Sequence, residues 1–453
     1  MRHPLLYSVI LALLSLSALP VFASSISKSV LPNGLTVIVK PEESSGIVAV
    51  EVFIKAGAAE ERESNAGIGN LVARTLLAST RNRRAETVAA VIDAVGGNFQ
   101  TEWHPDYTEI KVITTKAGFD STTSILGDIL NNAKFEQKWV DRAREEILTE
   151  IVTQGDDVFQ TSYEQVRMKL YQDNPYHRPT RGYVRSLRSI TVEDLQRFYQ
   201  QYYVPNNIVV CVVGDVTPER VLERMKIAFA GTSSRTLPRL RPIPAEELKE
   251  SKSELLERPI DAAYFLFGFL APSVTSEDYP AMRVTAAALG SGKGSRMFRN
   301  LRETKGLAYE LGTIYPTMKN QSHVLAYLVT DPYRRVLPGF SIEMMLEEVK
   351  QATLDEVSKL QKELLTPQEL ERAKQYTIGT YALQHQRLRD RAFHLGWLET
   401  IGLGCEYDLT YASKIEAVTA QDVQRVAKKY LNNYVMTIVL PETFEKDSLV
   451  SKE

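Results

Sequence analysis

The sequence predicts an α+β protein built as a tandem duplication of two homologous α/β lobes, each a sheet covered by helices. Three observations predict it. A segment of the first half recurs in the second half, and a shorter match occurs at nearly the same distance along the chain. Strand-like and helix-like stretches also mix without strict alternation, which favours α+β lobes.

The longer repeat pairs residues 190–202 with residues 418–430, and Thr, Asp, Gln, Arg and Tyr recur at matching positions. The shorter repeat pairs residues 140–144 with residues 370–374. Two widely separated matches at nearly one spacing indicate that a unit of about half the chain was duplicated.

Both copies of the longer repeat begin with the signature of a helix start. Thr191 and Thr419 are the expected N-caps, and Asp194 and Asp422 follow three residues later. Apolar residues then recur at i, i+3, i+4 and i+7, the spacing of one helix face. Each helix precedes a strand-like run, at 208–213 and at 435–440.

Further elements follow from the same rules. Runs rich in β-branched or aromatic residues predict strands at 36–39, 48–54 and 263–270. Longer periodic stretches predict helices at 136–153 and 367–388, the second with Thr366 as cap, Pro367 at the first helical position and Glu369 three residues beyond the cap.

These elements divide the chain into segments. Three prolines among basic residues at 235–244 indicate an exposed connection between the copies. The expected division is a signal peptide (1–23), an N-terminal lobe (24–234), a linker (235–258), a C-terminal lobe (259–440) and a flexible tail (441–453).

The N-terminus has the pattern of an export signal. Arg2 precedes an apolar stretch at 5–19, and cleavage after Ala23 fits the small residues that a signal peptidase reads. The stretch is short and rich in serine, so no membrane span is expected after cleavage. We expect an exported, periplasmic protein; an N-terminal membrane anchor is the alternative.

Composition and cysteine usage exclude several classes of protein. Lys and Arg total 54 against 56 Asp and Glu, a net charge of -2, so the chain has no basic excess for a nucleic-acid backbone. Two cysteines cannot form a disulfide framework. Cys211 and Cys405 allow one disulfide, but Cys211 lies in an apolar run, which favours a buried thiol.

Four segments carry a family resemblance. Residues 31–39 resemble the opening strand of the insulinase-like (pitrilysin) metallopeptidases. The approach to the zinc helix of that family is resembled by residues 55–62 and 67–69, and the signature of its second half by residues 295–309. The resemblance covers essentially the whole mature chain. It implies that the two lobes face each other across a cleft.

The zinc signature of that family is replaced in this sequence. The family carries H-x-x-E-H on a helix, with two zinc-binding histidines and a general base. The corresponding positions here are Asn70, Ala73 and Arg74, and Glu150 stands where the family supplies a further carboxylate ligand. We therefore expect no metal on this chain, and an Arg74–Glu150 ion pair in its place; alternatively, Glu150 is a solvated helix carboxylate. The histidines, His104 included, show no i, i+4 pairing and are expected to be ordinary surface or core residues.

The resemblance also implies a second group of functional residues. In the family an Arg and a Tyr seven residues apart reach the zinc site from the second lobe, and Arg302 and Tyr309 match them. Arg302 would bind the peptide backbone, and Tyr309 would donate to the oxyanion. The alternative is a solvated helix arginine and a half-buried strand tyrosine.

Substrate would add as a strand to a sheet edge that follows a Gly-Gly turn in the family. That turn corresponds to residues 96–97, so Gly97, Gln100 and Thr101 are the expected substrate-binding positions, although Gln100 and Thr101 replace the usual small polar residues.

Together these features predict the non-zinc subunit of a heterodimeric metallopeptidase, with zinc on a paralogous partner and a peptide or unfolded protein as substrate. A catalytically inactive peptide-binding or scaffold protein is the alternative, and a third is an independent peptidase that uses other residues.

Overall fold

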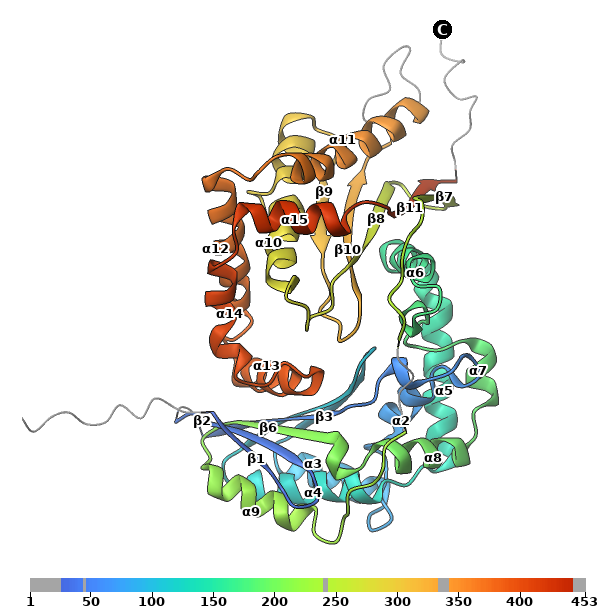
Figure 1. Ribbon diagram of the computed structural model, residues 1–453. Helices are drawn as coiled ribbons and strands as arrows, with labels where there is room; N and C mark the ends of the chain where they lie inside the picture. Colours follow the sequence, from blue (N-terminus) through green and yellow to red (C-terminus); the bar gives the residue numbers. More distant parts are fainter. Residues whose placement is uncertain (1–25, 44–45, 239–242, 333–341, 443–453) are drawn as a thin grey trace, which may run out of the picture.

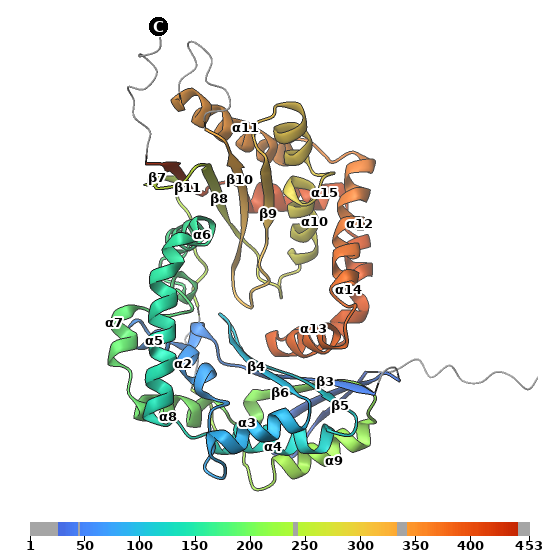
Figure 2. The same ribbon diagram turned by 180° about the vertical axis from the view of Figure 1, so that it is seen from behind.

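The computed structural model describes residues 26–43, 46–238, 243–332 and 342–442 (Figures 1 and 2). The strands of the first half are β1 (Ser27–Val30), β2 (Thr36–Pro41), β3 (Ile47–Ile54), β4 (Asn98–Trp103), β5 (Thr108–Thr115) and β6 (Ile208–Gly214). The strands of the second half are β7 (Lys252–Arg258), β8 (Ala263–Ala271), β9 (Glu310–Ile314), β10 (Ser322–Thr330) and β11 (Val435–Pro441).

Helices cover both sheets (Figure 1). Those of the first half are α2 (Ile68–Thr75), α3 (Ala85–Ala94), α4 (Phe119–Asn132), α5 (Gln137–Thr153), α6 (Val158–Leu170), α7 (Val184–Ser189), α8 (Val192–Tyr202) and α9 (Pro218–Ala228). Those of the second half are α10 (Tyr279–Gly290), α11 (Ile342–Lys362), α12 (Pro367–Leu383), α13 (Leu388–Ile401), α14 (Tyr407–Glu416) and α15 (Ala420–Tyr430).

The two sheets share one topology, which confirms the predicted duplication. Their strand orders are β1-β2-β6-β3-β5-β4 and β7-β11-β8-β10-β9. β2 pairs parallel with β6 as β7 does with β11, and the remaining pairs are antiparallel. Because β1 is an additional strand at one edge, the first sheet has six strands and the second five. The fold is the predicted α+β pair of lobes.

Predicted helix starts are confirmed at three places. Thr191 with Asp194, Thr419 with Asp422, and Thr366 with Glu369 each form a capping box. In each box the cap hydroxyl accepts the N3 backbone N–H and the acidic side chain accepts the cap N–H, so two otherwise unpaired donors are satisfied.

Two predicted boundaries differ from the structure. β7 lies inside the expected linker, because its backbone pairs in parallel with β11 although its own sequence is polar. The helix predicted at 367–388 ends at Leu383. Nδ1 of His385 lies 2.6 Å from the carbonyl oxygen of Tyr381 and so competes for an acceptor of the last turn. The expected signal peptide and residues 443–453 of the tail lie outside the described residues.

One helix of each lobe packs on the sheet of the other lobe. α6, from the first half, packs on β8 and β11, and α13, from the second half, packs on β3 and β6 (Figure 1). Both faces of β3 are therefore buried: Val50 and Val52 join the core beneath α2 and α8, whereas Ala49 and Phe53 pack with α13. The lobes are held together by two apolar layers rather than by a surface contact.

Glycines let these exchanged helices approach the sheets closely. A Cβ on Gly268 of β8 would lie 2.4 Å from Cγ1 of Val166 and 2.7 Å from Cδ1 of Leu170, both on α6. A Cβ on Gly396 of α13 would lie 2.4 Å from Cε2 of Phe53 on β3. The small residue is on the strand at one contact and on the helix at the other.

A buried histidine adds a polar contact between the lobes. His323 of β10 lies between two hydroxyls from the first half, with Nε2 2.7 Å from Tyr163 Oη and Nδ1 2.8 Å from Tyr171 Oη. Burial lowers the pKa of His323 to about 3, so the ring is neutral.

Cys211 and Cys405 are both buried free thiols, so the interpretation of Cys211 as a buried strand thiol is confirmed. Among the described helices, none is both long and apolar enough to cross a bilayer.

Candidate functional site

Helix α2 is positioned by a buried carboxylate. Its N-cap, Gly67, has φ +96° and no side chain, so the first turn receives no cap from its own position. Glu61 replaces that cap: its two carboxylate oxygens accept the N–H groups of Gly67 and Gly69, each at 2.9 Å. Trp103 of β4 packs directly on Gly69, where a Cβ would meet the indole at 1.9 Å. The entry of α2 is thereby fixed against the sheet.

The predicted replacements meet on α2 and α5. Arg74 Nη2 donates to Glu150 Oε2 at 2.6 Å, and Arg74 Nε donates to Asn70 Oδ1 at 3.2 Å. The predicted Arg74–Glu150 ion pair is confirmed. Ala73 adds only a methyl group, and its carbonyl accepts the hydroxyl of Thr101 at 2.7 Å. These five residues line a cavity of about 490 Å³.

The residues at the motif positions do not fit the zinc ion of the resembled family. A catalytic zinc takes three protein ligands and keeps one position open for water. Here an amide, a methyl group and a guanidinium stand at the positions of the motif, and the guanidinium already holds the one carboxylate that remains. Arg181 lies 3.7 Å from the same carboxylate and brings a second permanent positive charge. Two cations beside the site oppose the binding of a dication.

The predicted substrate edge is an edge of the first sheet. β4 is the last strand in that sheet, and it follows a turn in which Gly96 has φ +62°. Gly97 precedes the strand, and Gln100 points away from α2 and is exposed. Thr101 points the other way, toward α2, because side chains alternate along a strand and its hydroxyl is bonded to Ala73.

Arg302 and Tyr309 lie in the second lobe. Arg302 is exposed in a π-helix, Phe298–Thr304, where its guanidinium stacks over the ring of Phe298 with 5.0 Å between them. Tyr309 directly precedes β9; its backbone N–H donates to Val329 on β10, and its side chain is 45% exposed. Burial of its ring raises the pKa of Tyr309 above its ordinary value, so the hydroxyl stays protonated at neutral pH.

Among the described residues, no hydrogen bond or ion pair joins Arg302 or Tyr309 to Asn70, Arg74 or Glu150. The structure therefore brings together the degenerate metal positions and Thr101. Arg302 and Tyr309 lie apart from them, in the second lobe. The π-helix, a conformation found often at functional sites, had no signal in the sequence.

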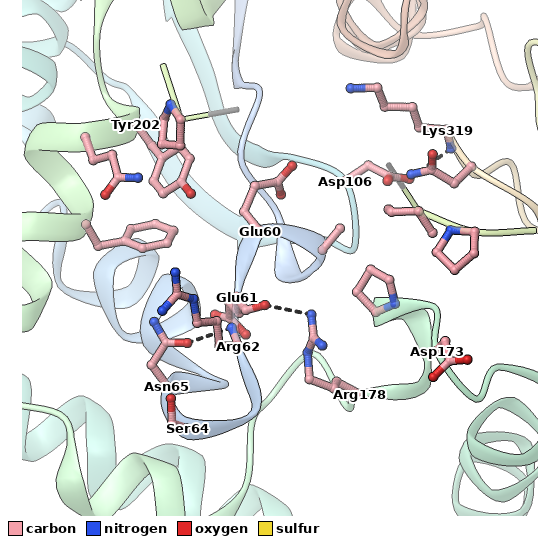
Figure 3. A pocket seen from close by; sticks show the side chains of 18 residues that line it. Glu60, Glu61, Arg62, Ser64, Asn65, Asp106, Asp173, Arg178, Tyr202 and Lys319 are labelled. Carbon is pink, nitrogen blue, oxygen red and sulfur yellow. Dashed lines mark hydrogen bonds between the residues drawn. The ribbon is translucent and has the colours of Figure 1, made fainter. Parts of the chain in front are cut away.

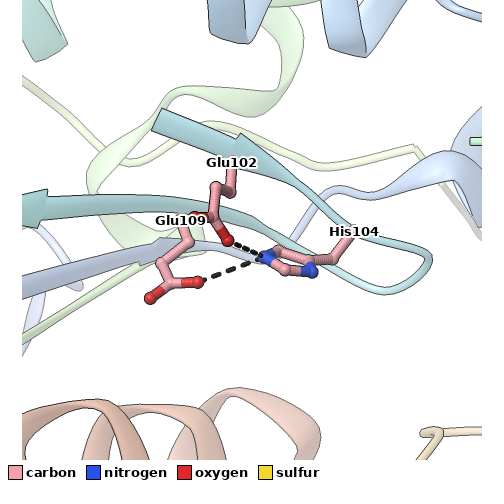
Figure 4. A group of neighbouring side chains, drawn as sticks. All are labelled: Glu102, His104 and Glu109. Carbon is pink, nitrogen blue, oxygen red and sulfur yellow. Dashed lines mark hydrogen bonds and ion pairs between the residues drawn. The ribbon is translucent and has the colours of Figure 1, made fainter. Parts of the chain in front are cut away.

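The sequence did not predict that a second group of polar side chains lies close together. Glu102, His104 and Glu109 converge on the hairpin formed by β4 and β5 (Figure 4). His104 Nε2 lies 3.5 Å from Glu102 Oε2 and 3.1 Å from Glu109 Oε2. Hydrogen bonds to His104 and Lys111 lower the pKa of Glu102 to about 2. Strand register, which the sequence alone does not fix, brings these residues together.

A larger cavity, of about 920 Å³, lies near the junction of the lobes (Figure 3). Glu60, Glu61 and Arg178 line it from the first lobe, and Lys319 lines it from the second. Lys319 donates its backbone N–H to Asp106 at 3.0 Å. Burial raises the pKa of Glu60 to about 7, and that of Glu61 to about 8 against the opposing effect of its two backbone donors.

Two family models match this chain. The insulinase (peptidase family M16) model matches residues 36–183, and the peptidase M16 inactive domain model matches residues 189–376.

Individual proteins match at low identity. An uncharacterized zinc protease of Streptomyces coelicolor is 26% identical over 292 residues, which are 63% of this chain and 64% of that protein. A probable mitochondrial-processing peptidase subunit beta of Arabidopsis thaliana is 24% identical over 406 residues, 88% of this chain and 75% of that protein. The solved structure of a peptidase M16 inactive domain from Pseudomonas fluorescens has a TM-score of 0.82 and 18% identity, covering 92% of this chain and 98% of that chain.

Fold and site together define a two-lobed peptidase architecture whose metal-binding helix has lost its ligands. The chain belongs to the insulinase-like (pitrilysin) family of metallopeptidases.

Proposed function

We propose that this chain is the non-zinc subunit of an exported, heterodimeric metallopeptidase, and that it supplies Arg302 and Tyr309 to a zinc-bearing paralogous partner. The observation that carries the proposal is the Arg74–Glu150 ion pair, which fills the metal position in an otherwise retained peptidase fold. The name of the Arabidopsis relative, a subunit of a processing peptidase, is consistent with a partner chain.

The chemistry assigned to this chain is binding and orientation. A zinc ion on the partner would supply the Lewis acid. An extended peptide would pair with the exposed edge of β4, whose backbone donors and acceptors have no strand on one side. Arg302 would donate hydrogen bonds to peptide carbonyl groups, and the protonated Tyr309 hydroxyl would donate to the oxyanion of the tetrahedral intermediate.

The exposure of both side chains supports these roles. Arg302 forms no ion pair among the described residues, so its guanidinium donors are available to a peptide. Tyr309 is exposed enough to reach a ligand while its backbone is held by β10.

Reconstitution with the partner tests the proposal. The chain is mixed with its zinc-bearing paralogue, and peptide cleavage is compared between wild type, Tyr309→Phe and Arg302→Ala. Loss of one oxyanion donor is expected to lower kcat by about 100- to 1000-fold. Arg299→Ala in the same π-helix and Tyr376→Phe on α12 are matched controls, and both should leave cleavage unchanged.

Cleavage that needs this chain but is indifferent to both Tyr309→Phe and Arg302→Ala would reject the catalytic role and favour the scaffold alternative. Cleavage by this chain alone would reject the need for a partner.

A further inference from the structure

The hairpin of β4 and β5 carries a group of potential metal ligands (Figure 4). Thr101 and Trp103 face α2, so Glu102 lies on the opposite face of the sheet, because side chains alternate along a strand. Glu102 and Glu109 are directly opposite each other in the strand register, and His104 lies in the connection between the strands. One ligand atom from each side chain lies within 4.8 Å of the others. We call these three residues the hairpin cluster.

A third carboxylate, which is buried, favours a cation at this place. Glu51 of β3 is fully buried and interacts with Glu109, and neither of its oxygens receives a hydrogen bond from a described N–H or hydroxyl group. The register places Glu51 opposite Lys111, so it lies on the sheet face of the cluster, beside Glu109. Oε1 of Glu109 is likewise buried without a donor. Buried carboxylates without partners are rare, because each loses its hydration without compensation.

The charged groups around the hairpin cluster also favour a divalent cation. Three carboxylates are present, and within the described residues Lys111 is the lysine or arginine that forms ion pairs with them. Its Nζ lies 2.6 Å from Glu102 Oε1 and 3.7 Å from Glu109 Oε2. Arg389 of α13 acts on Glu51 at longer range without an ion pair. A histidine that ligates a metal is neutral, so a divalent cation bound there would balance the charges of Glu102 and Glu109.

We propose that the hairpin cluster binds one divalent transition-metal ion through His104 Nε2 and one oxygen each of Glu102 and Glu109. Ligand atoms that are each about 2.0–2.2 Å from an ion lie roughly 3–4 Å apart, and the observed separations of 3.1 and 3.5 Å match that spacing. One imidazole and two carboxylates suit zinc or manganese. Lys111 would then turn from Glu102 to its cross-strand neighbour Glu51.

This site is distinct from the lost zinc position. Its ligands come from β4 and β5 rather than from α2 and α5, although Glu102 and His104 also line the cavity that contains Arg74. A bound ion would tie β4, the edge strand, to β5. The inference goes beyond the proposed function and does not rest on it.

Metal titration of the full chain, without an affinity tag, tests the proposal. The protein is stripped with EDTA, dialysed and titrated with ZnCl₂ or MnCl₂ by calorimetry, and one ion per chain is expected. Loss of an outer-shell partner weakens metal sites by about 10- to 100-fold, so loss of a ligand should weaken this one at least as much. Glu102→Gln and His104→Gln should both do so. Glu164→Gln removes a carboxylate of the same cavity that pairs with Arg181, and it should not.

An independent measurement covers variants that fail to fold. X-ray absorption of the wild-type chain loaded with one zinc ion should show an imidazole nitrogen among oxygen ligands. Absence of stoichiometric binding, a zinc ion without imidazole, or binding that survives Glu102→Gln but is lost in Glu150→Gln would overturn the proposal. The cleavage assay with the partner, which depends on Arg302 and Tyr309, reports separately on the proposed function.

Discussion

Gly268 is expected to control how closely the two lobes pack. We predict that Gly268→Ala destabilises the protein, although alanine suits a strand better than glycine does. The backbone at this position has no positive φ, so the substitution alone should gain about 0.4–1 kcal/mol from the unfolded state. The new methyl group, however, would lie 2.4 Å from Val166 and 2.7 Å from Leu170 of α6.

The contact distances set the magnitude. Carbon atoms prefer separations of about 3.5–4.0 Å, so two contacts are each short by roughly 1 Å and α6 must move or leave its rotamers. Overpacking of this kind costs about 1–3 kcal/mol, which leaves a net loss of about 1–2 kcal/mol. Val166→Ala alone removes two methyl groups from a fully buried side chain and should cost about 2–3 kcal/mol.

The double variant makes the prediction decisive. In Gly268→Ala/Val166→Ala the new methyl group occupies space that Val166 vacates, so the total loss should be about 1–2 kcal/mol rather than the sum of the two. Urea unfolding followed by both tryptophan fluorescence and circular dichroism measures the three values. Additive losses would refute the claim that Gly268 and Val166 share one tight contact, and a more stable Gly268→Ala would refute the claim of close approach.

Three further predictions concern the cap, the buried histidine and the metal position. Glu61→Ala should leave the N–H groups of Gly67 and Gly69 unpaired and cost about 2–4 kcal/mol, seen as faster hydrogen exchange in Ile68–Thr75; Glu61→Gln, which keeps one acceptor, should cost less. His323 has a pKa of about 3 when folded and an ordinary value of 6.5, so the unfolded chain binds the extra proton between these values. Stability should therefore fall by about a few kcal/mol as pH drops from 6.5 toward 3, and His323→Gln should flatten that dependence in urea unfolding at several pH values. Asn70→His/Ala73→Glu/Arg74→His, made in a Glu102→Gln background, should bind one zinc ion that is lost again on adding Glu150→Gln, as measured by elemental analysis; no zinc would contradict the alignment of these positions.

Local signals explain what could be predicted from the sequence. Thr191 and Asp194 identify a helix start because their hydrogen bonds lie within four residues. The Arg74–Glu150 pair could be predicted because the resemblance placed both residues at ligand positions of the same zinc ion in the family. Both cases depend on short range or on a known template.

Structure that depends on contacts between distant segments could not be predicted from the sequence. β7 is polar and becomes a strand only because β11 offers it a pairing edge. The exchange of α6 and α13 depends on the packing of two lobes, and contacts between lobes are not local in the sequence. Glu51 and Glu109 meet only through the register of β3 and β5, which a one-residue slip would destroy.

The crossing of α6 and α13 between the lobes has a consequence for how such a chain can be divided. A polypeptide limited to one lobe would present a bare apolar sheet and a helix with nowhere to dock. Two identical copies would complete each other by trading that helix, as symmetric dimers do when they swap an element. In the present chain, the two lobes are arranged like the subunits of such a dimer but are joined in one polypeptide. Each half expressed alone should therefore be insoluble, and the two halves should fold only when they are expressed together.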